Sequence, residues 1–205
     1  MRKIASHQGI LVSLVGLVAL LIVLLVLLPA EQTLGGVIKV VFLHGAILEV
    51  SLVVFAVAGL LGLVSFFWKK QSVHDWVMAL QKTGLMMWVL SVLMSMVATY
   101  LAWGVLIAWE EPRVQVSAKI LGSGVVFFVL TQWVEDERFA AAVSIVMAVV
   151  AWWLTQGAGT IRHPLNPIGS SGSWMFKGLY GAMLVVVAII ALQAARWLRK
   201  GEEGG

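Results

Sequence analysis

The chain has no cysteine among its 205 residues, and only 12% of its residues are charged. The missing thiols exclude disulfides, thiolate redox chemistry, Fe–S clusters and cofactors attached through cysteine. The low charge is about half of the ~25% that is typical of a soluble domain. The sequence also lacks a phosphate-binding loop, a nucleophile elbow and a zinc-protease motif. We therefore expect no bond-making active site and do not classify the chain as an enzyme.

Long apolar runs make up most of the sequence, 61% of which is hydrophobic. Runs of about 20 apolar residues are typical of transmembrane helices. The predicted spans are residues 9–29, 44–68, 84–109, 115–134, 140–156 and 174–197, and an interfacial inner helix is predicted over residues 70–82. The sequence therefore predicts an all-α, six-transmembrane-helix bundle that forms one integral membrane domain over residues 1–205.

The distribution of basic residues predicts the orientation of this bundle. Six spans put both termini on one side, and that side carries most of the 14 Lys and Arg residues. Because cytoplasmic loops are enriched in Lys and Arg, we expect both termini to be cytoplasmic. The net charge of +4 then reports topology, and we expect no nucleic-acid partner.

Pairs of glycines predict where helices approach one another closely. The pairs are Gly59 and Gly62 in the second span, Gly122 and Gly124 in the fourth, and Gly178 and Gly181 in the sixth. Small residues allow the backbones of neighbouring membrane helices to come into contact. We expect each pair to seat a neighbouring helix.

Two histidines lie at the predicted outer end of the bundle. His44 opens the second apolar run, and His163 lies in the polar stretch between the fifth and sixth runs. An imidazole in this setting can ligate a metal ion or haem iron. Haem also needs an apolar slot for its ring and cations for its two propionates. These requirements predict non-covalent haem b with His44 and His163 as axial ligands.

Aromatic and basic residues at the same end are candidates for the rest of this site. Candidates for the slot are Trp103, Trp109, Trp152 and Trp153, and candidates for partners of the propionates are Arg113, Arg162 and Lys119. Tryptophans at a membrane interface commonly form an aromatic belt instead. Basic groups can also pair with lipid phosphates or with neighbouring glutamates. Both alternatives stay open at the level of the sequence.

Glu49 is an ionisable residue inside a predicted span, about 7.5 Å further along the helix than His44. Ionisable groups within the bilayer are rare and usually face the bundle interior or a polar cavity. Lys119 lies at a similar depth in the fourth span, so an ion pair with Glu49 is one interpretation. Such a pair makes the second and fourth spans neighbours. In the other interpretation, Glu49 shapes the haem pocket or carries a proton.

Three short motifs follow one another along the chain. They are KVVFLH at Lys39–His44, WGVLIAWEEPR at Trp103–Arg113 and WWLTQGAG at Trp152–Gly159. In a six-helix frame these motifs resemble the haem-handling proteins of the CcmC/CcsA cytochrome c assembly family, over roughly residues 39–165. The resemblance implies haem b held at the outer leaflet between two histidines, over a platform of tryptophans. It also implies delivery of that haem to a chaperone or to an apocytochrome.

The chain departs from the family pattern within the second and third motifs. Leu106 and Ile107 occupy two central aromatic positions of the tryptophan motif, and one extra residue precedes Arg113. The second histidine of the family falls at Thr155 or is deleted, and His163 follows about two helical turns later. The resemblance therefore supports haem binding more than haem transfer.

These observations predict a haem-handling protein of the inner (plasma) membrane that acts in cytochrome c biogenesis. Its expected partners are haem, membrane lipid, and other membrane subunits or a haem chaperone. One alternative is a membrane b-haem subunit that passes electrons, although the inner side offers only His7 and His74 for a second haem. Another alternative is a haem-free scaffold or transporter of the same fold.

Overall fold

The computed structural model describes residues 2–161, 168 and 171–202, and its regular structure over these residues is helical. The helices are α1 (Arg2–Leu27), α2 (Ile38–Phe67), α3 (Gln71–Trp103), α4 (Pro112–Val134), α5 (Glu137–Gln156) and α6 (Trp174–Glu202). All six are long and apolar enough to cross a membrane. The described residues thus confirm the predicted all-α class and have the make-up of a multi-pass membrane protein.

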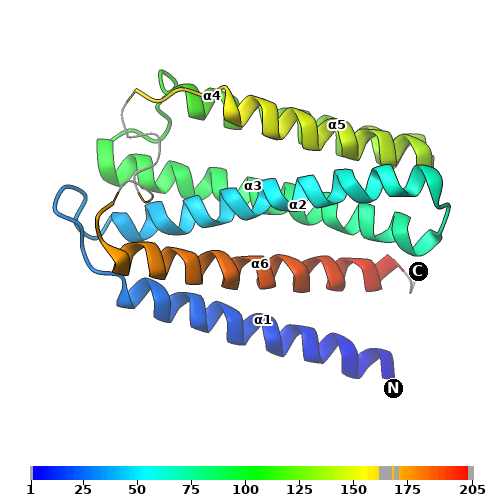
Figure 1. Ribbon diagram of the computed structural model, residues 1–205, viewed down its shortest axis with the longest axis horizontal. Coiled ribbons are helices and arrows are strands. Elements are labelled where there is room, and N and C mark those ends of the chain that lie inside the picture. Colours follow the sequence, from blue (N-terminus) through cyan, green and yellow to red (C-terminus); the bar gives the residue numbers. More distant parts are fainter. Residues whose placement is uncertain (1, 162–167, 169–170, 203–205) are drawn as a thin grey trace.

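The central pair of the bundle is α2 and α3, and the other helices flank it (Figure 1). On one side lie α5 and α4. On the other side lies α6, with α1 packed outside it (Figure 1). The two ends of the chain lie at the same end of the bundle, beside the α2–α3 and α4–α5 turns, and we call this the termini end (Figure 1). The opposite end holds the α1–α2 and α3–α4 connections, the end of α5 and the start of α6, and we call it the His44 end (Figure 1).

The first part of α3 differs from the sequence-based expectation. A separate interfacial helix was expected over residues 70–82, whereas α3 runs without interruption from Gln71 to Trp103. Val77 and Leu80, two apolar residues of the expected interfacial helix, are 0% and 8% exposed. These residues therefore pack against neighbouring helices. The sequence did not reveal this, because an apolar helix face can contact either lipid or protein.

Helix ends near the candidate site also differ from the predicted spans. The third helix ends at Trp103 instead of 109, because Gly104 takes a left-handed conformation (φ 74°) and its N–H bonds to the carbonyl of Tyr100. The second helix starts at Ile38 instead of 44, and its first turns bury Ile38 and Phe42 in the core. Trp109 therefore lies in the α3–α4 connection and not on a helix.

A seam of small residues joins α2 to α5. A Cβ added at Gly59 would lie 2.7 Å from the Cβ of Ala148, and one at Gly62 would lie 2.8 Å from the carbonyl oxygen of Ala141. Gly124 is similarly close to Leu85 of α3, at 2.9 Å. These three glycines confirm the expected close packing. The expectation was wrong for Gly122, Gly178 and Gly181, where a Cβ would meet nothing within 4 Å.

Candidate functional site

The fold gathers most of the candidate residues at the His44 end. His44 lies in the second turn of α2, and Arg113 lies in the first turn of α4. Trp103 ends α3, and Trp152 and Trp153 lie in the last turns of α5. Arg162 and His163 lie outside the described residues, so the structure does not place the proposed second axial ligand.

His44 is half-buried, and its side chain reaches from α2 to Ser91 on α3. Its Nδ1 lies 2.9 Å from the main-chain oxygen of Ser91 and 3.0 Å from the Ser91 Oγ. The Ser91 hydroxyl in turn donates to the main-chain oxygen of His44, at 3.4 Å. A carbonyl oxygen only accepts, so Nδ1 must carry the proton of the ring. In the neutral imidazole, Nε2 is then the nitrogen with the lone pair.

The candidate tryptophans differ in their exposure. Trp103 is half-buried, whereas Trp109, Trp152 and Trp153 are 58%, 55% and 73% exposed. Tryptophans of an interfacial belt are exposed, and so are those of an open haem platform, so exposure does not distinguish the two. The two interpretations given by the sequence therefore both stand.

Glu49 has a partner on α6 and not on α4. The Glu49 carboxylate lies near the hydroxyl of Tyr180 on α6. Tyr180 also packs edge-on against Phe42, with ring centroids 5.4 Å apart. Lys119 points out of the bundle from α4, and α2 packs along α3, α5 and α6. The predicted ion pair between Glu49 and Lys119 is therefore wrong, because Lys119 is exposed and α4 packs along α3 and α5 instead of α2.

The buried carboxylate of Glu111 connects two loops at the His44 end. Glu111, just before α4, is 1% exposed, and both of its carboxylate oxygens lie 3.2 Å from the backbone nitrogen of Ile161. The contact ties the α3–α4 connection to the residues that follow α5.

Comparison with known proteins adds no family. A scan against models of protein families and a search of curated proteins each found no match. The resemblance to the cytochrome c assembly family therefore remains a prediction from the three motifs.

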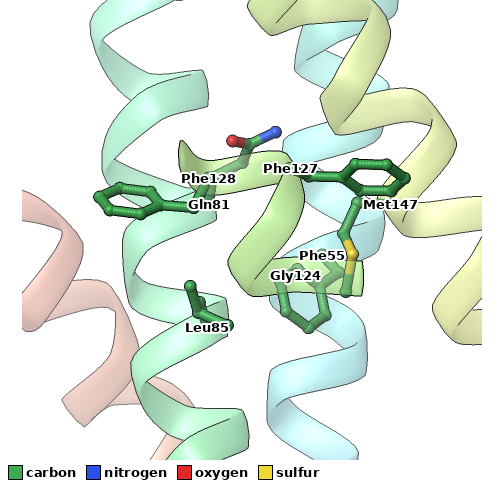
Figure 2. Close-up of a pocket in the computed structure, with 7 residues that line it drawn as sticks. All are labelled: Phe55, Gln81, Leu85, Gly124, Phe127, Phe128 and Met147. Atoms are coloured by element: carbon green, nitrogen blue, oxygen red, sulfur yellow. The ribbon is translucent and has the colours of Figure 1, made fainter. Parts of the chain in front are cut away.

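Neither of two pockets in the described residues corresponds to the expected haem slot. The first lies within the bundle and is lined by Phe55, Gln81, Leu85, Gly124, Phe127, Phe128 and Met147 (Figure 2). Its free volume of about 10 Å³ is roughly the room of one water molecule. The second is much larger, at about 320 Å³, and lies at the termini end. Neither pocket is lined by His44 or by the candidate tryptophans, so neither is the expected slot.

Three residues of this region were missed in the sequence. Ser91 and Tyr180 are polar residues inside long apolar runs, a signal that could have marked them as partners of His44 and Glu49. Glu111 carried no such signal, because it adjoins a second glutamate at the start of a helix. Its burial depends on the path of the chain after α5, which the local sequence does not reveal.

Proposed function

We propose that the chain binds haem b at the His44 end of the bundle, with His44 as an axial ligand. The observation that supports this function is the hydrogen bond of His44 Nδ1 to the main-chain oxygen of Ser91 (2.9 Å). Metal-binding histidines commonly donate one ring N–H to a carbonyl, which fixes the tautomer and leaves the other nitrogen for the metal. The hydrogen bond from His44 to the Ser91 main chain is of this kind and supports the proposal on that ground.

Trp103 and Arg113 are our candidates for the other contacts that haem needs. Trp103 and Arg113 lie at the same end, one at the end of α3 and one at the start of α4. An indole can stack on the ring, and a guanidinium can meet a propionate. With the orientation given by the positive-inside rule, this end faces outward from the inner membrane. Haem is then cargo for cytochrome c assembly, as the resemblance implies.

An absorption spectrum of the purified chain tests this function. We expect a Soret band in protein from haem-replete cells, or after haem is added, and we expect His44→Ala to lose most of it. Ser91→Ala keeps the main-chain oxygen and should keep the band. His74→Ala, at the termini end, is the matched control. A colourless protein that takes up no haem, or a band unchanged in His44→Ala, would contradict the proposal.

The same hydrogen bond also supports a second candidate function, a haem-free scaffold. In that case His44 serves only to hold α2 against α3, and its loss should lower stability without changing any spectrum. His44→Gln separates the two functions, because an amide can still donate to the oxygen of Ser91 but is a poor ligand for haem iron. A scaffold tolerates this change, whereas a haem site loses its band.

A further inference from the structure

A polar pocket opens at the termini end, far along the bundle from His44. Its volume is about 320 Å³, which falls at the lower end of the ~300–1,000 Å³ range of small-molecule sites. The α2–α3 turn and the α4–α5 turn form its walls. The lining residues are Ser65, Phe66, Trp68, Lys69, Lys70, His74, Glu135, Asp136, Glu137 and Arg138.

Both signs of charge line this pocket in equal number. Lys69, Lys70 and Arg138 supply three cations, and Glu135, Asp136 and Glu137 supply three carboxylates. The Asp136 carboxylate already accepts the N–H of Phe139 at 2.7 Å and so caps α5. A simple anion would meet carboxylates here, and a simple cation would meet ammonium groups. The ligand that matches both sets is a zwitterion with separated charges.

Aromatic residues around the pocket indicate its depth in the membrane. Phe67 and Trp68, at the end of α2, are 82% and 66% exposed, and Trp133, near the end of α4, is 81% exposed. Exposed tryptophans at the ends of spanning helices mark the level of the lipid headgroups. The charged pocket therefore lies at the depth where the membrane presents phosphates and ammonium groups.

We propose that this pocket binds an ammonium-phosphate zwitterion, the chemistry of a phosphatidylethanolamine headgroup. The phosphate is held by the amines of Lys69 and Lys70, and the primary ammonium is held by the carboxylates of Glu135 and Glu137 through charge-assisted hydrogen bonds. The ligand can come from the lipid or from free phosphoethanolamine. This inference does not depend on haem binding, because the pocket lies at the other end of the bundle.

Lipid binding to the full chain in detergent tests the proposal. We expect phosphatidylethanolamine to bind at least fivefold more tightly than phosphatidylcholine, whose ammonium cannot donate hydrogen bonds, and than anionic phosphatidylglycerol. Lys70→Gln and Glu137→Gln should each abolish this preference, whereas Lys70→Arg should keep it. Lys177→Gln, at the His44 end, is the control and should behave as the unchanged chain.

The outcomes separate the possible sources of the ligand. Competition by free phosphoethanolamine at equal concentration supports the zwitterion site and assigns it to a soluble ligand. Failure of free phosphoethanolamine to compete assigns the site to the lipid. Equal binding of the three lipids overturns the proposal. Preferential binding of phosphatidylglycerol also overturns the proposal if Lys70→Gln removes it and Glu137→Gln does not. That result would indicate a basic patch that binds anionic lipid.

Discussion

The first two helices share a strongly apolar composition but occupy opposite positions in the bundle. The mean hydropathy of an 18-residue window is 3.4 in the span His7–Leu27 of α1 and 2.5 in α2. However, only 6% of the window in α1 is buried, against 50% of the window in α2. Lipid tails are as apolar as leucine, so hydropathy brings both helices into the membrane without placing either one in the core. The core position of α2 has to come from other features.

Surface shape is the feature that separates the two helices. Gly59 and Gly62 let α2 approach α5, because a Cβ at Gly59 would overlap the Cβ of Ala148 and a Cβ at Gly62 would overlap the main-chain oxygen of Ala141. α1 also contains glycines, Gly9 and Gly16, but a Cβ there would meet nothing within 4 Å. A glycine in a membrane helix therefore indicates a packing seam only where the partner helix also presents small residues, as Ala141, Ser144 and Ala148 do.

The largest expected difference between the surroundings of α1 and α2 comes from removing a side chain that packs against α2. Trp88 of α3 is 1% exposed, contacts the ring of Phe55 and donates from Nε1 to the main-chain oxygen of Ser117, at 3.1 Å. We expect Trp88→Ala to lower the free energy of unfolding by about 3–5 kcal/mol. Val15→Ala on α1, a residue 71% exposed, should change it by less than about 0.5 kcal/mol. Equilibrium unfolding in mixed micelles measures both, and similar losses would contradict the contrast.

A methyl group added to the α2–α5 seam should have the next largest effect. Gly62→Ala puts a Cβ 2.8 Å from the main-chain oxygen of Ala141, so the helices must separate. Overpacking of this kind costs about 1–3 kcal/mol. Gly16→Ala is the matched control on α1 and should be nearly neutral. If both substitutions are tolerated equally in the unfolding measurement, the seam does not fix the position of α2.

A polar contact beside the same seam should contribute less. Gln81 of α3 donates from Nε2 to the hydroxyl of Ser144 on α5, and both residues are buried. Hydrogen bonds between membrane helices are worth about 0.6 kcal/mol on average. A double-mutant cycle with Gln81→Leu and Ser144→Ala should give a coupling energy of that size. Additive losses would show that shape alone positions the helices.

The sequence predicted those parts of the fold that depend on hydropathy along the chain. The number of helices in the described residues and their apolar character follow from runs of about 20 apolar residues. The continuous α3 was missed, because a stripe such as Val77 and Leu80 packs equally well on lipid or on a neighbouring helix. The end of α3 at Trp103 was missed as well, although Gly104 is the glycine that ends it.

The candidate site was predictable in its location but not in its contacts. Alternation of the spans across the membrane puts His44, Trp103 and Arg113 at one end, whatever the packing. Which residue meets His44 or Glu49 depends on the rotation of each helix about its axis and on its neighbours. The structure gives these partners as Ser91 and Tyr180, and pairing by depth alone had favoured Lys119.

The smallest expected effect lies in the turn that connects α1 to α2. Glu31 accepts the backbone N–H groups of Thr33 and Leu34, each at 2.8 Å. These two hydrogen bonds hold the pKa of the exposed Glu31 carboxyl below its usual range, and the bond from Leu34 has the larger effect. A lowered pKa means that the stabilisation of the turn is present above the ordinary glutamate pKa of about 4.3. It is lost as the pH falls through the lower value of the folded turn.

Amide hydrogen exchange measures this loss residue by residue. We expect the exchange protection of the Thr33 and Leu34 amides, corrected for the intrinsic rate, to hold from pH 7 to about 5 and to decline below about pH 4. Glu31→Gln should remove the pH dependence, while amides within α2 stay protected throughout. If acid also released the amides of α2, the turn would be coupled to the core. If only the turn responds, α1 is held by lipid and by α6, independently of the turn that joins it to α2.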